Sequence, residues 1–214
     1  VGVAGLVDKE TSVLTISGNL NINGVNFKNL LFDKFNVPIE IENDVNVGVL
    51  GEWKHGAGKG HQNVVGLFVG TGIGGGLILN GMLYTGCSGL AAEIGHVTVK
   101  QGGIYCTGCG TQGCLEAYAG KVGLENRIEN IAKKGIKSVL IDMVVANNGK
   151  LKSSHIKIAL EQKDEVAMDI LAEAMEYLGT GIAGAINMLN PSVVVLGGGV
   201  MEAVGQAYIA KIKR

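Results

Sequence analysis

The stretch that decides the fold spans residues 63–84 and reads Asn-Val-Val-Gly-Leu-Phe-Val-Gly-Thr-Gly-Ile-Gly-Gly-Gly-Leu-Ile-Leu-Asn-Gly-Met-Leu-Tyr. Residues 63–69 are apolar enough for a strand that is buried on both faces. Residues 74–79 predict the next strand, and Asn80-Gly81 is typical of a two-residue type I′ turn. We therefore expect a sheet in which a glycine-rich loop, Gly70–Gly76, follows a buried strand.

Outward from this stretch, apolar periodicity predicts strands and helices in alternation, which indicates an α/β architecture. Residues 136–150 fit either a strand or a helix. Glycines 179, 181 and 184 lie inside one expected helix, where each costs about 1 kcal/mol relative to alanine, so we expect close packing there. Further strands are expected over 1–7, 12–17, 38–42 and 192–196, and helices over 26–35, 43–55, 115–134 (broken near 120–123), 153–162, 164–189 and from 200 onward.

The composition excludes several classes of protein. There are 35 glycines among 214 residues but only 2 prolines and no three-residue period, which excludes collagen. With 47% hydrophobic and 17% charged residues, the chain can bury a core and is not a disordered glycine-rich segment. The net charge is −1, no polybasic run occurs, and no apolar run approaches the roughly 18 residues of a membrane span.

Two glycine clusters are candidate nucleotide loops. Backbone N–H groups in Gly70–Gly76 can converge on a phosphate, although no lysine follows as in a P-loop. Gly197–Gly199 lies between an expected strand and helix, where nucleotides tend to bind. The alternatives are a glycine-rich hairpin without a ligand for the first cluster and an ordinary tight turn for the second.

Glu42-Asn43-Asp44 places a carboxylate and an amide at the end of an expected strand. Asp44 could accept a proton from a substrate hydroxyl while Asn43 holds a neighbouring group. The commoner use of Asn-Asp is to cap a helix, and the two uses are compatible.

Three thiols and one imidazole lie within 19 residues, at His96, Cys106, Cys109 and Cys114. This set matches a structural Cys3His zinc site, with a disulfide or free thiols as alternatives, and it favours a reducing compartment. With one nitrogen of His96 on zinc, the other could donate to a ligand hydroxyl. Glu93 and Glu116 flank the set and are either acceptors for further hydroxyls or solvated carboxylates. Cys87 stands apart, and we expect a buried, small apolar side chain there.

In chain order these motifs resemble those of the ROK family (repressors, open reading frames and sugar kinases), most closely its glucokinase-like members. Residues 42–46 resemble the family's E-N-D-x-N segment, and 70–76 its second phosphate loop. Residues 93–96 match its E-x-G-H signature, and 109–116 match most of C-x-C-G-x-x-G-C-x-E. The first cysteine pair departs from the family, because two residues rather than one separate Cys106 from Cys109.

The resemblance implies an α/β, actin-like ATPase fold of the ribonuclease H-like type. It implies ATP-dependent phosphorylation of a glucose-like hexose at the 6-hydroxyl, with Mg²⁺ and with Asp44 as general base. The implied roles are sugar binding by Asn43, Asp44, Glu93, His96 and Glu116, contact with ATP by Thr71, Gly72, Gly198 and Gly199, and structural zinc on His96, Cys106, Cys109 and Cys114.

The resemblance also implies a division into the remainder of an N-terminal α/β domain, residues 1–42, and a C-terminal α/β domain, residues 43–214, which carries a zinc loop over 93–116 and the nucleotide-side glycine loops. The family's D-x-G-G-T loop and its last helical segment are missing, so we expect a sugar kinase truncated at both ends. Relatives suggest a cytoplasmic homodimer or tetramer, with a sugar and ATP as partners and no membrane.

The alternative function is the sugar-sensing module of a ROK transcriptional repressor, which would bind nucleic acid through a separate domain. A third reading is a zinc-stabilised sugar-binding protein without turnover. Asp44 and the intact Gly70–Gly76 segment favour the kinase.

Overall fold

The computed structural model describes residues 1–8, 10–16, 22 and 24–212, and these form an α/β fold. The chain divides into two compact units. The first unit contains residues 1–67, 75–93 and 191–195, and the second contains 68–74, 94–190 and 196–214. The domain boundary expected after residue 42 stays a prediction.

The N-terminal part of the first unit contains two small sheets. Strand β1, Gly2–Val3, pairs in parallel with β4, Glu42–Asn43, and β2, Leu6–Val7, pairs antiparallel with β3, Leu14–Ile16. Val3, Val7 and Leu14 form a common core. The strands expected over 12–17 and 38–42 are thus shorter than predicted, and residue 17 lies outside the described residues.

Two helices of the first unit begin as expected. Helix α1, Phe27–Phe35, is capped by the side chain of Asn26, which accepts a hydrogen bond from the backbone N–H of Asn29. Helix α2, Asp44–His55, is capped by Asn43. Both caps use short amide side chains because such groups can accept from the first unpaired N–H groups of a helix.

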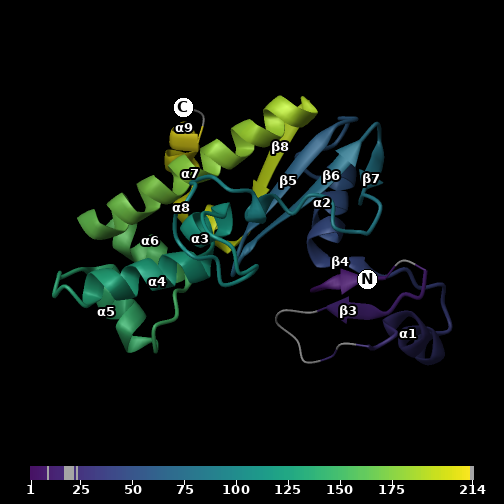
Figure 1. Ribbon diagram of the computed structural model, residues 1–214, viewed down its shortest axis with the longest axis horizontal. Coiled ribbons are helices and arrows are strands. Elements are labelled where there is room, and N and C mark those ends of the chain that lie inside the picture. The colour runs from purple at the N-terminus through teal and green to yellow at the C-terminus, as the bar shows by residue number, and fades with distance from the viewer. Residues whose placement is uncertain (9, 17–21, 23, 213–214) are drawn as a thin grey trace. The chain divides into compact units, whose positions relative to one another are not determined.

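A third, larger sheet contains four strands in the order β7-β6-β5-β8 (Figure 1). Strands β5 and β6 are joined by three residues and therefore run antiparallel, as do β6 and β7. The φ angles of Asn80 and Gly81 are both positive, +53° and +74°, as the predicted type I′ turn requires. The bounds are β5 Val64–Val69, β6 Ile73–Leu79, β7 Met82–Tyr84 and β8 Val193–Gly197.

The glycines of the expected loop over 70–76 divide between a turn and a strand. Only Gly70-Thr71-Gly72 form the connection, while Gly74–Gly76 belong to β6. Gly76 lies against α2, where an added Cβ would come within 2.8 Å of the Val49 side chain. The last of these glycines is therefore explained by the packing of a helix on the sheet.

Helices dominate the second unit. The segment 136–150, which sequence left open, contains a helix, and the helix expected from residue 200 is interrupted at Gly205, whose φ is +63°. The bounds are η1 Ile94–His96, α3 Leu115–Ala119, α4 Lys121–Ala132, α5 Val139–Ala146, α6 Ser153–Glu161, α7 Glu165–Leu189, α8 Gly199–Val204, η2 Gln206–Tyr208 and α9 Ile209–Ile212.

The long helix α7 carries the core of this unit. Ile170, Leu171, Met175 and Leu178 recur on one face and are almost completely buried. This spacing is that of an amphipathic helix that packs with one stripe inward. Within the described part of the chain, no helix combines the length and the apolar character needed to cross a membrane.

Candidate functional site

The Glu42-Asn43-Asp44 segment forms the junction between β4 and α2. The Asn43 side-chain oxygen accepts the N–H groups of Val45, at 2.9 Å, and of Asn46, at 3.2 Å. Its Nδ2 donates to the carbonyl of Gly5 at 3.2 Å. The cap that sequence offered as the common use of Asn43 is therefore confirmed, and among the described residues the second N–H of its amide has no acceptor.

Asp44 is the first residue of α2, and it is exposed. Its Oδ1 accepts the backbone N–H of Val45 at 3.0 Å. Glu42 accepts from the backbone of Asn43, at 2.8 Å, and from the buried side chain of Asn46, at 3.1 Å. Glu42 and Asn43 thus hold the backbone at the start of α2, and Asp44 presents a carboxylate to solvent.

The turn Gly70-Thr71-Gly72 is closed by backbone hydrogen bonds. The N–H of Gly70 donates to the carbonyl of Gly72 at 2.9 Å. The carbonyls of Gly70 and Thr71 accept from the first N–H groups of α4, those of Lys121 at 3.0 Å and Val122 at 3.1 Å. The carbonyls therefore face α4, and among the described residues no acceptor pairs with the N–H groups of Thr71 or Gly72.

Gly198 and Gly199 join β8 to α8. Gly198 has a φ of +93°, and an added Cβ would lie 2.5 Å from the carbonyl oxygen of Val69 at the end of β5. At Gly199 the Cβ would lie 2.7 Å from the hydroxyl of Ser153. Close approach of strand and helix thus explains both glycines, as in the ordinary-turn alternative, and their contact with a nucleoside stays a prediction.

The four candidate zinc ligands lie together. His96 Nδ1, or its other ring nitrogen, and the sulfur atoms of Cys106, Cys109 and Cys114 all lie within 4.8 Å of one another. The Cys109 and Cys114 sulfurs are 3.4 Å apart, and Cys106 Sγ is 3.8 Å from His96 Nδ1. Tetrahedral zinc with Zn–S bonds of about 2.3 Å separates its ligand atoms by roughly 3.7 Å, so this set fits zinc.

All four cysteines of the chain are free, so the disulfide alternative does not describe this structure. The prediction for Cys87 was wrong, because this residue is exposed. It follows the tight turn at Gly86, whose φ is +70°, and lies outside the cluster. A lone cysteine carries no periodic signal that distinguishes a buried from an exposed position.

The surroundings of the thiols differ in their effect on acidity. Burial raises the pKa of Cys106 to about 11. The hydroxyl of Thr111, 3.1 Å from Cys109 Sγ, lowers the pKa of that exposed thiol to about 7. Thr111 also lies 3.0 Å from Cys114 Sγ. Sequence reasoning gave Thr111 no role, although its position between Cys109 and Cys114 was visible.

Glu116 extends the cluster toward the glycine turn. Its side chain is half-buried, and Oε2 accepts the backbone N–H of Ile73 at 2.8 Å. Its Oε1 accepts from the thiol of Cys106 at 3.8 Å. The alternative of a solvated surface carboxylate is therefore wrong for Glu116, whereas Glu93 is exposed.

Tyr118 packs against the loop that carries Cys106 and forms a hydrogen bond with it. Its hydroxyl accepts the backbone N–H of Ile104 at 2.8 Å, and its ring lies 4.1 Å from that of Tyr177 on α7. Cys106 and Cys114 pack in the same buried cluster as Tyr118. The sequence pattern gave no indication of this anchoring of the cysteine loop by Tyr118.

The residues expected to bind a sugar belong to both units. Asn43, Asp44 and Glu93 are part of the first unit, and His96 and Glu116 are part of the second. Within the second unit, Glu116 joins the metal cluster and the glycine turn. These features define a class of protein. Its members have an α/β fold with a Cys3His cluster, a helix that begins with an acidic residue, and a glycine turn.

Comparison with known proteins names the family. The family model described as "ROK family" matches residues 1–213, and the chain belongs to this family. It is 36% identical over 204 residues to the glucokinase of Thermotoga maritima. The matched region covers 95% of this chain and 64% of that relative. The chain thus spans about 64% of the length of the curated glucokinases that it matches.

This chain is also similar to a glucokinase of known structure and to a transcriptional repressor. The ROK family glucokinase from Streptomyces griseus, in complex with glucose and AMPPNP, superposes with a TM-score of 0.79 at 30% identity and covers all of this chain and 71% of its own. The xylose repressor of Caldicellulosiruptor bescii is 30% identical over 213 residues, covering 100% of this chain and 52% of the relative. The expected ROK sugar kinase fold is confirmed, and the family includes both kinases and repressors.

Proposed function

We propose that the protein phosphorylates a glucose-like hexose at its 6-hydroxyl with ATP and Mg²⁺. The observation that carries this proposal is the exposed carboxylate of Asp44 at the start of α2, in a chain that is similar to glucokinases along 95% of its length. Its neighbour Asn43 fixes the helix start by capping. A carboxylate held in this way can accept the proton of an attacking hydroxyl.

In this proposal the remaining sugar hydroxyls are bound by side chains that accept or donate hydrogen bonds. Glu93 and Glu116 accept, and Asn43 offers its remaining amide hydrogen. His96 presents Nδ1 toward Cys106, so Nε2 is the nitrogen that we assign to a sugar hydroxyl. Zinc on the four ligands would hold the imidazole in that orientation, and a closed four-ligand site leaves no position for a reactive water.

We assign the ATP phosphates to the N–H groups of Thr71 and Gly72 and the nucleoside to Gly198 and Gly199. Phosphoryl transfer requires positioning and neutralisation of charge more than covalent chemistry. The backbone bonds that direct the turn's carbonyls toward α4 leave its N–H groups for an anion. Mg²⁺ would supply the remaining positive charge on the phosphates.

The proposal is tested by replacing Asp44→Asn in the intact protein. We expect turnover to fall by about 10²–10⁴-fold, because the general base is lost, while the sugar dissociation constant changes by less than about tenfold. ADP release and calorimetric sugar binding are the measurements. Asp33→Asn, an exposed aspartate on α1 of the same unit, is the matched control and keeps full turnover. Undiminished turnover in Asp44→Asn would overturn the assignment.

The second candidate is the sugar-sensing module of a repressor. It is favoured by the 30% identity to the xylose repressor over the whole of this chain. In that case the intact protein binds a sugar and changes its affinity for DNA, but it releases no ADP with any hexose or N-acetylhexosamine. A screen of these sugars with ATP, run beside a DNA-binding assay with and without sugar, separates the two candidates.

A further inference from the structure

The carboxylate of Glu116 lies between two glycines from different segments. An added Cβ on Gly72, in the turn after β5, would meet Oε2, and one on Gly108, in the cysteine loop, would meet Oε1. A side chain on either glycine would therefore displace the end of the Glu116 side chain. Glu116 therefore fills the space between the turn and the cysteine loop.

The hydrogen bonds of the turn show what Glu116 adds. The carbonyls of Gly70 and Thr71 are held by α4, and the buried N–H of Ile73 is held by Glu116. A buried N–H without an acceptor is unfavourable, so displacement of this carboxylate loosens the start of β6. The two sides of the turn are thus fixed by different elements.

The contact with the cysteine loop does not depend on the thiol proton. Cys106 donates to Oε1 as a thiol, and that proton leaves when the sulfur binds a metal. The contact of Gly108 with Oε1 involves no thiol proton, and His96 Cε1 lies 3.2 Å from the Cβ position of Gly108. Metal ligands on both sides of Gly108 would fix its position, and with it the carboxylate.

We propose that Glu116 is a positioning residue through which the metal-bound cysteine loop sets the shape of the Gly70–Gly72 turn. The loop limits where the carboxylate can lie, and the carboxylate in turn holds the N–H of Ile73. Where this turn binds ATP phosphates, which rests on the proposed function, metal loading then affects nucleotide affinity without any metal–nucleotide contact.

The decisive variant is Gly108→Ala in the zinc-loaded protein, because the new methyl group meets Oε1 of Glu116, whereas the N–H of Ile73 is bound by Oε2. We expect amide hydrogen exchange at Ile73 to accelerate at least about tenfold, as the Glu116 bond opens locally, while zinc content stays at one per chain. AMPPNP affinity is expected to weaken at least about fivefold. Amides of Val65 and Leu67 in β5 serve as internal references and do not change.

Two further variants keep the test decisive. Glu116→Gln retains an oxygen for the Ile73 N–H and is expected to keep exchange within about twofold of wild type, whereas Glu116→Ala is expected to match Gly108→Ala. Gly184→Ala is the matched control, because nothing lies within 4 Å of its Cβ position. Chelation of zinc from the wild-type protein should also accelerate exchange at Ile73.

Unchanged Ile73 exchange in both Gly108→Ala and Glu116→Ala would overturn this inference, even in a protein that phosphorylates hexoses. Faster exchange in a protein that phosphorylates none would support the coupling and refute the kinase proposal. The two proposals can therefore fail separately.

Discussion

At the scale of single residues, three glycines of α7 show how little a sequence pattern says about contacts. Sequence predicted close packing at all three. An added Cβ would lie 2.8 Å from the carbonyl oxygen of Ile212 at Gly179 and 2.7 Å from the Leu115 side chain at Gly181. At Gly184 there is open space, so that prediction was wrong.

Gly184→Ala and Gly181→Ala form a matched pair in one helix. Both gain helix propensity of about 1 kcal/mol, but overpacking against the buried Leu115 costs about 1–3 kcal/mol at Gly181 alone. We expect Gly184→Ala to raise the free energy of unfolding. The free energy of unfolding of Gly181→Ala should be roughly 2 kcal/mol lower than that of Gly184→Ala. Urea unfolding measures both, and equal stabilities would refute the packing explanation.

At the scale of elements, one carboxylate joins the starts of two helices. Asp164 caps α7 by accepting the Ala167 N–H at 2.8 Å. It also accepts from the Ser138 hydroxyl, at 2.8 Å, and from the Leu140 N–H, at 3.2 Å, at the start of α5. This long-range cap is a physical reason why the segment left open by sequence is a helix.

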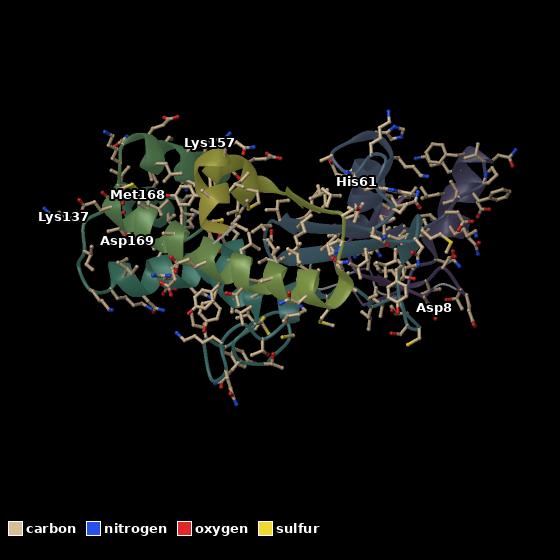
Figure 2. All side chains as sticks on the ribbon, turned by 90° about the horizontal axis from the view of Figure 1, so that it is seen from above. Asp8, His61, Lys137, Lys157, Met168 and Asp169 are labelled. Atoms are coloured by element: carbon tan, nitrogen blue, oxygen red, sulfur yellow. The ribbon has the colours of Figure 1, made fainter. Side chains whose placement is uncertain are left out.

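Asp164→Ala removes all of these hydrogen bonds. We expect a loss of roughly 2–3 kcal/mol in the free energy of unfolding, from the lost cap and the unpaired donors that remain buried. Asp169→Asn, exposed on the same helix and labelled in Figure 2, is the control and should stay within about 0.5 kcal/mol of wild type. Denaturant unfolding at neutral pH is the measurement.

The same carboxylate predicts a dependence on pH. Burial alone would raise the pKa of Asp164, but hydrogen bonds from Ala167, Ser138 and Leu140 outweigh it and lower the pKa below its ordinary value of 3.8. Its stabilisation is therefore complete above pH 3.8 and is lost as the pH falls through the lower folded-state pKa. Asp164→Ala should lose less stability than wild type on acidification, and parallel curves would contradict this.

At the scale of the whole molecule, the cysteine cluster organises a long loop. The loop between η1 and α3 contains no helix or strand, and its Cys106 and Cys114 pack with Tyr118 in a buried cluster against Tyr177 of α7. Loops of this length need an internal support, and a four-ligand metal would supply it.

Metal analysis of the protein should find about one zinc per chain. Cys109→Ser is expected to abolish stoichiometric zinc and to lower Tm by at least about 5 °C, since metal binding to the folded state stabilises it. The matched control is Cys87→Ser, another exposed cysteine outside the cluster, which keeps both values. If the wild-type protein contains no zinc and has the same Tm as the Cys87→Ser variant, the zinc site is refuted.

The sequence by itself determined the α/β class, the order of most elements, the ROK motifs and the four metal-ligand candidates. These features are local, because strand, turn and cap signals and the spacing of the cysteines act over a few residues. Only the tertiary structure decided that α5 is a helix, that Cys87 is exposed, that Gly184 lies in open space and that Glu116 joins the cysteine loop to the glycine turn. The helix and the link made by Glu116 depend on partners distant in sequence, Asp164 for Leu140 and Glu116 for Ile73, and no local pattern encodes such a partner. The exposure of Cys87 and the open space at Gly184 depend on where the rest of the chain packs, which a local pattern does not encode either.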